Sequence, residues 1–575
     1  MSSNNPGYDL IIVGGGLAGL TAALRSVELG LKTLLFEKGE GEDYPCNSRQ
    51  SGGILHILFH DPYRPAQELF DFIAEATDGE AQRDLAEALA KNGSRLISWL
   101  QSNGARFMRF NQQEGYRWCM APPRALRAGI DWRGRGPDVV LRQLALKFVE
   151  RGGTLRLRTR ATGLIMEHGV CVGVRTFCDG REERWRAAQC LIADGGFQAN
   201  PELFKSHIGP SFDAVFQRGA RTGMGDGMQM AVAVGAALTE THRFYGHLLC
   251  ADARSNDNVW PYPELDAIAT AGLVVGESGR RIVDEGRSGV YLANALAALP
   301  AAGRFHVIFD GAIWEGPGKS ARIPANPLLE RAGGTVVRAD TLEELARKIG
   351  IPQAELARTV SEYHAAFDSD VLDTLSPSRS RRIKPWRIAQ PPFMAIPAIP
   401  GITYTMGGLA IDARARVLDK DGRPIEGLMA AGATTGGLEG GSNAVYIGGL
   451  IKAGSFGLIA AENAARNQNR PVPADDFRAE QSASTGQGPG AAGGGLTEIS
   501  HGLDRFPMLR ATLRFGNQIS LAVGLVVVAF TLWLGWPPLG AAAIFLAVLL
   551  GAGAAVAIRS YTELVKLITE LLIPD

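Results

Sequence analysis

The first 36 residues carry an apolar pattern that predicts a strand, a helix and a second strand. Residues 8–13 form a continuous branched apolar run, which is typical of a strand buried on both faces of a parallel sheet. Residues 20–29 have helical spacing, and residues 32–36 form a second apolar run. This order predicts the first unit of a fold that mixes helices and strands, of the α/β (α+β) class.

A second layer is predicted further along the chain. Between residues 154 and 192, apolar residues recur with strand spacing around a turn at Asp179-Gly180. Such a pattern predicts a β-hairpin. We expect this hairpin to be an inserted layer that returns to the first sheet.

From residue 235 to 392 the pattern changes to irregular stretches with many prolines and to amphipathic helices at residues 341–349 and 352–367. This change predicts a second domain inserted into the first. The predicted parts are a first cofactor-domain segment (1–235), a substrate-capping domain (236–395), a second cofactor-domain segment (396–467), a linker (468–500) and a C-terminal segment (505–575).

The composition of the C-terminal segment and of the linker before it predicts a membrane anchor. Gly and Ser crowd residues 482–495, a composition that cannot bury enough apolar surface to fold. Residues 519–536 and 539–558 then form two uncharged apolar stretches separated by Pro537-Pro538. Each is close to the ~20 residues needed to cross a bilayer. We interpret them as a two-helix transmembrane hairpin, with a pair of buried core helices as the alternative.

Basic residues flank both ends of this hairpin. The positive-inside rule therefore places both flanks in the cytoplasm and the catalytic domains on the cytoplasmic face of the inner membrane. The apolar positions within residues 561–572 predict a helix lying along the lipid surface. The flanking residues are Arg505, Arg510, Arg514, Arg559 and Lys566.

Composition excludes several classes of function. Lys+Arg and Asp+Glu are equal at 59 each, so there is no electrostatic footprint for nucleic acid. The six cysteines contain no C-x-x-C, which argues against a metal site, an iron–sulfur cluster or c-type haem. The N-terminus lacks a basic region followed by a removable apolar stretch. We therefore expect reduced thiols and a cytoplasmic body.

A nucleotide site is predicted directly after the first strand. Gly14, Gly16 and Gly19 give G-x-G-x-x-G between that strand and the helix, where bare backbone lets a pyrophosphate approach the helix N-terminus. Glu37 ends the second strand and is placed to accept hydrogen bonds from ribose hydroxyls. Strand, helix and acid together favour dinucleotide binding over a structural glycine turn.

Further blocks of sequence follow in a fixed order. They are Asn47-Ser-Arg-Gln-Ser-Gly52-Gly53, Thr159-Arg-Ala161, Ala193-Asp-Gly195-Gly196, Gly223-Met-Gly225-Asp226-Gly227, Gly279-Arg-Arg-Ile-Val-Asp284-Glu285, Thr405-Met-Gly407-Gly408, Gly427-Leu-Met-Ala-Ala431-Gly432 and Ser455-Phe-Gly457. With the glycine turn, this set resembles the flavoprotein family of fumarate reductase, succinate dehydrogenase, tricarballylate dehydrogenase and 3-ketosteroid dehydrogenase. The resemblance covers about residues 8–467.

The resemblance implies a Rossmann-like FAD-binding domain, a mobile capping domain inserted within it, and a substrate held between the two. The FAD contacts that it implies are Gly14, Gly16, Leu17, Ala18, Gly19, Glu37, Lys38, Ser48, Gly52, Gly53, Ala161, Asp226, Gly432, Gly448 and Gly449.

Departures from the family narrow the expectations. Succinate dehydrogenases carry a histidine that bonds FAD covalently, but residues 47–51 contain none, so we expect non-covalent FAD. Ala433 replaces the acid of the usual Ala-Gly-Glu. Tyr404 stands where fumarate reductases have a histidine, and residues 438–446 lack their substrate-clamping arginine. A plain fumarate reductase is therefore disfavoured.

Three residues are the catalytic candidates. Tyr446-Ile-Gly448-Gly449 resembles the Tyr-Pro-Gly-Gly of tricarballylate and ketosteroid dehydrogenases, with Tyr446 as the base and the glycine amides as donors to an enolate. Arg287 lies near the position of the fumarate reductase proton donor, and Tyr404 is the third candidate. A packed core tyrosine and a solvent-facing arginine are the alternatives for Tyr446 and Arg287.

Other side chains are weaker candidates for the pocket wall. His247 and the arginine-rich stretch at 117–135, with Tyr116, Arg124, Arg127 and Arg133, would suit an anionic substrate, although each residue alone is more typical of a structural role.

We predict an FAD-dependent oxidoreductase that acts on a CH–CH bond next to a carboxyl or carbonyl group. Tricarballylate-like dehydrogenation is the first expectation, fumarate-type reduction the second and ketosteroid dehydrogenation the third. No second redox centre is evident, so electrons would pass to quinone or an electron-transfer protein. A non-catalytic flavin redox sensor, or the flavin subunit of an electron-transfer assembly, is the alternative.

Overall fold

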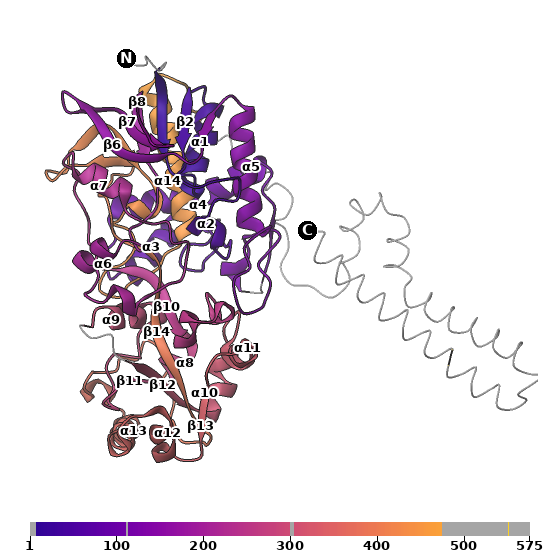
Figure 1. Cartoon of the computed structure of the whole chain (residues 1–575), viewed down its shortest axis with the longest axis vertical. Coiled ribbons are helices and arrows are strands. Elements are labelled where there is room, and N and C mark those ends of the chain that lie inside the picture. Colours follow the sequence, from indigo (N-terminus) through magenta and orange to yellow (C-terminus); the bar gives the residue numbers. More distant parts are fainter. Residues whose placement is uncertain (1–6, 111–112, 300–303, 474–549, 551–575) are drawn as a thin grey trace, which may run out of the picture. The chain divides into compact units, whose positions relative to one another are not determined.

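The structure is a computed structural model that describes residues 7–110, 113–299, 304–473 and 550. The chain divides into two compact units, residues 1–479 and 480–575. All helices and strands described below lie in the first unit (Figure 1).

The cofactor domain is built on a sheet whose main strands run in the order β15-β16-β8-β1-β2-β5. Strand β1 pairs in parallel with both β2 and β8, and Leu10, Ile11 and Ile12 in its centre have no exposure to solvent. Branched side chains buried on both faces explain the continuous apolar run of this strand. The strands are β1 (Tyr8–Val13), β2 (Thr33–Phe36), β5 (Thr154–Arg156), β6 (Arg160–Glu167), β7 (Val170–Cys178), β8 (Arg181–Ile192), β15 (Arg416–Leu418) and β16 (Pro424–Ala430).

Helices from both ends of this unit pack beside the sheet. Helix α14 approaches α1 closely, because a Cβ at Gly457 would lie only 2.5 Å from the carbonyl oxygen of Ala18. The N-terminal and C-terminal segments of the cofactor domain therefore share one core. The helices of this domain are α1 (Leu17–Glu28), α2 (Asn47–Gln50), α3 (Ala66–Ala76), α4 (Arg83–Ser102), α5 (Gly136–Glu150), α6 (Pro201–His207), α7 (Asp226–Val232) and α14 (Gly449–Asn467).

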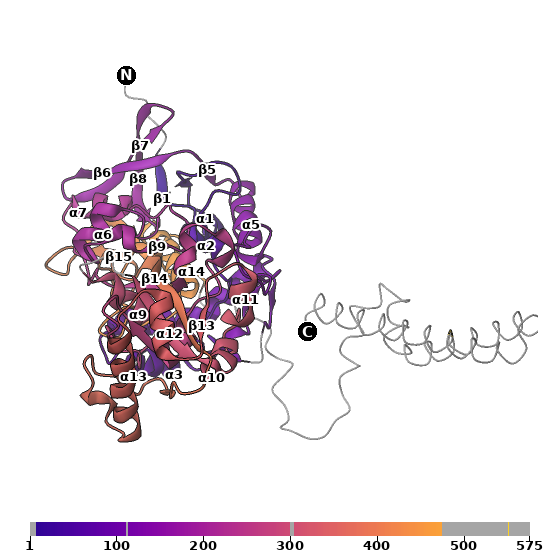
Figure 2. The same cartoon turned by 60° about the horizontal axis from the view of Figure 1, so that its bottom comes forward.

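A second sheet forms the core of the capping domain, with β14 at its centre. Strand β14 pairs with β10, β12 and β13 in antiparallel fashion and with β9 in parallel. The strands are β9 (Phe216–Gln217), β10 (Phe244–Cys250), β11 (Leu273–Val275), β12 (Phe305–Asp310), β13 (Val337–Ala339) and β14 (Phe393–Thr405). The helices are α8 (Asp266–Ala271), α9 (Gly289–Ala297), α10 (Gly311–Glu315), α11 (Ala325–Arg331), α12 (Leu342–Ile349) and α13 (Gln353–Asp368). Figure 2 shows α12 and α13 at the end of this unit opposite to β6, β7 and β8.

The predicted mixed α/β fold is confirmed. The first helix begins at Leu17, ahead of the expected residue 20, and the predicted hairpin is a three-stranded antiparallel layer. Thr341 caps α12 as its pattern indicates, by accepting a hydrogen bond from the amide of Glu344 at 3.1 Å.

The capping domain differs from the sequence expectation. Irregular structure was expected from residue 235 to 392, but strands of the second sheet occupy parts of it. Strands β11 and β13 are three residues long, too short for an alternating pattern to register. Strand β14 also crosses the boundary expected between residues 395 and 396.

Within the described residues, no helix has both the length and the apolar character needed to cross a bilayer. The predicted hairpin at 519–558, the linker beyond residue 473 and the surface helix at 561–572 lie outside the described residues.

Candidate functional site

The turn between β1 and α1 forms one end of a large cavity, here called the central cavity. Gly14 has φ +103°, and a Cβ there would lie 2.5 Å from the carbonyl oxygen of Ala193. Gly19 allows α1 to pack on the strand, because its Cβ would lie 1.9 Å from the oxygen of Gly14. Gly16 differs, since its Cβ would meet only the Ser48 hydroxyl, at 3.4 Å. The first two glycines are thus required by the fold, whereas Gly16 leaves space in the cavity.

The ribose end of the cavity is shaped by Glu37. Its carboxylate accepts the amide hydrogens of Gly15 and Gly39, both at 2.7 Å. Nearby, Asp226 at the start of α7 pairs with Lys38 at 3.1 Å and with Arg160 at 2.6 Å. These contacts join segments that are far apart in sequence around the predicted position of the nucleotide.

Unpartnered acceptors line the adjoining wall. Asp194 Oδ1 and Gln198 Oε1 are buried without a hydrogen-bond partner in the described structure, and both residues line the cavity. Burial raises the pKa of Asp194 to about 6. A Cβ at Gly195 would contact nothing within 4 Å. Buried acceptors beside bare backbone fit the hydroxyl groups of the FAD ribityl and ribose moieties.

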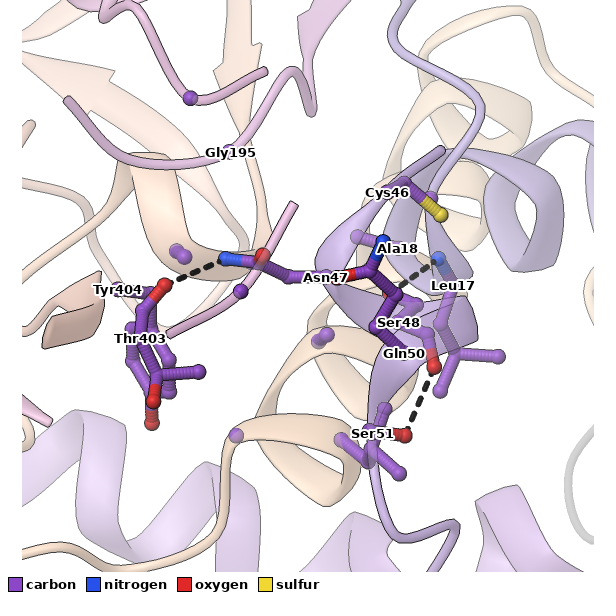
Figure 3. A pocket seen from close by; sticks show the side chains of 18 of the residues that line it. Leu17, Ala18, Cys46, Asn47, Ser48, Gln50, Ser51, Gly195, Thr403 and Tyr404 are labelled. Atoms are coloured by element: carbon purple, nitrogen blue, oxygen red, sulfur yellow. Dashed lines mark hydrogen bonds between the residues drawn. The ribbon is translucent and has the colours of Figure 1, made fainter. Parts of the chain in front are cut away.

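Helix α2 lies beside the first turn of α1 in the wall of the central cavity (Figure 3). Ser48 accepts the amide of Leu17 at 3.1 Å, and the Asn47 side chain donates to the carbonyl oxygen of Thr403 at 2.8 Å. Asn47 also accepts the amide of Ala220 at 2.8 Å. This amide side chain therefore ties the cofactor domain to the end of β14, within the block that lacks a histidine.

Most predicted cofactor residues line the central cavity. They are Gly14, Gly16, Leu17, Ala18, Glu37, Lys38, Ser48, Gly52, Gly53, Ala161, Asp226, Gly432 and Gly449. Gly19 and Gly448 do not line it. The amide of Gly448 instead donates to Glu439 at 3.2 Å, so it is already engaged. The individual contacts with FAD stay predictions.

Tyrosine side chains gather at the other end of the cavity. Tyr446 and Tyr404 line it together with Tyr245. The Tyr245 and Tyr446 rings stack with centroids 3.9 Å apart, and the Tyr404 ring lies 5.5 Å from that of Tyr245. Burial raises the pKa of all three phenols well above its ordinary value, and in Tyr404 the Glu439 carboxylate adds to this. The shift favours the protonated phenol, so the three hydroxyls can serve as hydrogen-bond donors to a ligand, and the role of Tyr446 as a base stays a prediction.

Arg287 lies elsewhere. It is outside the cavity lining, pairs with Asp284 at 3.5 Å, donates to the carbonyl oxygen of Ser442 at 3.3 Å and covers the Tyr291 ring. The structure therefore does not bring Arg287 together with the two tyrosine candidates in the lining of the cavity.

Three charged residues that the sequence did not single out line the cavity: Arg218, Arg322 and Glu264. Arg218 donates to the Pro261 carbonyl at 3.1 Å and to the Thr403 hydroxyl at 3.0 Å, but its Nη2 is buried without a partner. Arg322 likewise has two buried nitrogens without a partner, Nε and Nη2, and Glu264 has one such oxygen, Oε2. Burial raises the pKa of Glu264.

These charges point to a polar ligand. An unsatisfied buried polar atom costs about 1–3 kcal/mol, and more when it is charged. Arg218 and Glu264 both line the cavity, and each has a buried polar atom without a hydrogen-bond partner. Free guanidinium nitrogens suit a carboxylate or carbonyl oxygen. Sequence reasoning missed these residues because they come from separate segments without a shared motif.

Glu439 organises the wall behind the tyrosines. Its buried carboxylate accepts from the Tyr404 hydroxyl at 3.1 Å, from the Ile447 amide at 3.1 Å and from the Gly448 amide, and it pairs with Lys452 at 2.6 Å. This single carboxylate fixes the end of β14, the turn before α14 and the first turn of α14.

Replacing Gly16 with alanine is expected to weaken FAD binding at least about tenfold while leaving the apoprotein folded, because the added methyl enters the space of the pyrophosphate. Gly14→Ala is the contrasting variant. It should lose both stability and FAD, because its Cβ clashes with backbone. FAD titration and thermal unfolding of the apoproteins distinguish the two. Equal apoprotein stability of both variants would contradict the assignment.

His56 predicts a pH dependence of stability. Its Nδ1 accepts the Phe59 amide at 3.1 Å, and burial lowers its pKa from 6.5 to about 4. The unfolded chain therefore binds more protons between these values, so the contribution of His56 is complete above pH 6.5 and is lost as pH falls toward 4. The loss is on the order of 3 kcal/mol.

Urea unfolding of apoprotein between pH 6.5 and 4.5 measures this effect. His56→Gln should flatten the pH dependence, whereas His168→Gln, at an exposed turn, should leave it as in the wild type. An unchanged slope in His56→Gln would rule out the assignment.

Comparison with known proteins places the chain among flavoproteins. Residues 9–445 match the family described as FAD binding domain. NADH:acrylate oxidoreductase of Vibrio harveyi is 29% identical over 534 residues, which covers 79% of this chain and 50% of that protein. The chain thus spans about half the length of this relative. A probable fumarate reductase, Ifc3, of Shewanella frigidimarina is 29% identical over 477 residues, covering 80% of this chain and 75% of that protein.

The solved structures agree in fold. A 3-ketosteroid Δ1-dehydrogenase from Sterolibacterium denitrificans matches with a TM-score of 0.63 at 21% identity, covering 80% of this chain and all of that one.

Proposed function

This chain belongs to the FAD binding domain family, and on that premise we propose that it is an FAD-dependent oxidoreductase that reduces a C=C bond conjugated to a carboxylate. FAD is its cofactor. When bound, FAD supplies the two-electron chemistry of the reaction. The activity of the whole protein is part of the proposal, because this chain spans only about half the length of the relative from Vibrio harveyi.

The observation that carries the proposal is the set of unpartnered atoms on Arg218 and Arg322 in the cavity that also holds the FAD-binding glycines. Two guanidinium groups can hold a substrate carboxylate and stabilise the negative charge that develops on it as the double bond is reduced. Glu264 lines the same cavity, and its side chain offers no positive charge to a second or third carboxylate. A substrate with one carboxylate therefore fits better than tricarballylate.

The phenols favour the reductive direction. A C=C reduction needs a proton at the α-carbon, and the cavity presents three buried tyrosine hydroxyls that can donate one. The reverse reaction would require one of them to lose its proton first. The curated relatives named for acrylate and fumarate chemistry support this choice.

The test uses the full chain with its FAD reduced under anaerobic conditions. Acrylate, crotonate, cinnamate and fumarate are added in turn, and the visible flavin absorbance is followed. We expect at least one monocarboxylate to restore the oxidised spectrum, with the saturated acid as product. If every acid leaves the flavin reduced while oxygen reoxidises it, the catalytic proposal fails and a redox sensor becomes the better account.

We further propose that the protein is attached to the inner membrane, faces the cytoplasm and exchanges electrons with quinone or a partner protein. The support is the sequence of residues 519–558, which lie outside the described structure. Ending the chain after Ser484 is expected to give a soluble flavoprotein with unchanged FAD content. Fractionation of cells that express each form measures this. Continued membrane association of the shortened chain would refute the anchor.

A further inference from the structure

A chain of hydrogen bonds leads from the capping domain into the central cavity. Tyr245 and His247 project from the same face of β10, and Asp266 begins α8. Asp266 Oδ2 lies 2.5 Å from His247 Nδ1, and His247 Nε2 lies 2.9 Å from the Tyr245 hydroxyl oxygen. Tyr245 and His247 both line the cavity.

The aspartate of this chain is itself fixed. Its second oxygen accepts the amide of Leu248 at 2.9 Å. Gly289 leaves room for it, because a Cβ there would lie 1.9 Å from the Asp266 carboxyl carbon. An ionised carboxylate only accepts, so it holds neutral His247 in the tautomer with a proton on Nδ1. Nε2 is then free to accept the Tyr245 hydroxyl proton.

We propose that Tyr245 is the catalytic acid–base residue that exchanges a proton with the substrate α-carbon, and that His247 and Asp266 position it and renew its proton. This inference rests on the proposed function. In this series the carboxylate orients the imidazole, and the imidazole forms a hydrogen bond with the hydroxyl group. This is the arrangement in which an oriented histidine exchanges a proton with a hydroxyl group.

Tyr245 is better placed for this role than its neighbours. The Tyr404 hydroxyl is committed to Glu439, whose side chain has no exposure to solvent. Tyr446 stacks on Tyr245 through its ring. Tyr245 forms a hydrogen bond with His247, and histidine is the side chain suited to proton exchange near neutral pH. The His247 side chain is 14% exposed. Within this proposal, His247 takes up protons from water through the exposed part of its ring.

The proton steps balance as follows. In reduction, the Tyr245 O–H bond breaks as a C–H bond forms at the α-carbon, while the hydride equivalent for the β-carbon comes from the reduced flavin. Water then protonates His247 at Nε2, and this proton passes from Nε2 to the phenolate oxygen, which restores the neutral imidazole with its proton on Nδ1. The charged or titratable groups around Tyr245 during these steps are His247, Tyr446, Tyr404, Tyr262, Arg218 and Glu264.

The first test compares variants of the full chain carrying FAD. Tyr245→Phe is expected to lower turnover of the accepted acid at least about 100-fold without loss of FAD. His247→Gln and Asp266→Asn should lower kcat and move the acidic limb of its pH profile. Tyr363→Phe is the matched control, because it removes a buried hydroxyl that bonds the Trp386 carbonyl outside the cavity. Turnover of Tyr245→Phe equal to that of this control would overturn the proposal.

A second measurement does not depend on turnover. In the substrate-free holoprotein with ¹⁵N-labelled histidine, the signal that disappears in His247→Gln identifies this residue. Neutral His247 is expected to carry its proton on Nδ1, and Asp266→Asn should change that signal. A proton on Nε2 in the wild type would overturn the relay. If the wild type reduces no acid, the proposed function fails. The tautomer of His247 still tests, independently of turnover, whether the hydrogen-bond chain has the described proton positions.

Discussion

Replacing Glu439 with alanine is expected to lower the free energy of unfolding by about 3–5 kcal/mol, because it leaves a buried lysine without its partner. The Glu439 and Lys452 side chains are 0% and 3% exposed, and their charged atoms lie 2.6 Å apart. The Tyr404 hydroxyl and two backbone amides lose their acceptor as well. Urea unfolding of the apoprotein measures the change.

Two further variants make this test specific. Glu315→Ala breaks an exposed pair with Lys319 and should lower the free energy of unfolding far less than Glu439→Ala. Combining Glu439→Leu with Lys452→Met removes both buried charges and should recover most of the lost stability. A double variant as unstable as Glu439→Ala would show that the lost backbone contacts, rather than the unpaired lysine, dominate.

Replacing Arg322 with methionine is expected to lower kcat/KM for an unsaturated acid by about 30- to 5,000-fold. This range corresponds to the 2–5 kcal/mol typical of losing one partner of a buried charge pair. Arg322 reaches the cavity from the capping domain with two unpartnered nitrogens, while its guanidinium covers the Phe110 ring at 4.0 Å. Methionine keeps much of the side-chain volume but provides no donor.

Steady-state kinetics with matched FAD content provide the measurement. Arg280→Met is the control, because Arg280 is an exposed residue of the same domain that pairs with Glu355. Its kcat/KM should match that of the wild type. An equal loss in both variants would mean that Arg322 acts through the stability of the capping domain and not through the substrate.

The cofactor end of the site was predictable because its signal is local. Gly14, Gly19 and Glu37 lie within one strand–helix–strand unit, and each has a backbone or packing requirement that restricts the residue type. The strands around them are buried, so their sequences are continuously apolar. Local chemistry and local structure therefore coincide in this part of the chain.

The substrate end was predictable only in part. Tyr404 and Tyr446 were found through a resemblance, and both line the cavity. Arg218, Arg322 and Glu264 are brought together only by the folded capping domain, so no spacing along the chain reveals them. Arg287 shows the opposite case, since its position in the sequence resembled a catalytic site while its side chain bonds outside the cavity.

The contacts of Glu439 also restrict how this protein can diverge. One carboxylate serves Tyr404, the turn at Ile447 and Gly448, and Lys452. A change at position 439 alone leaves a buried cation without its partner, and a change at position 452 alone leaves a buried anion without its partner. Natural relatives are therefore expected to exchange the two residues jointly, so that positions 439 and 452 covary.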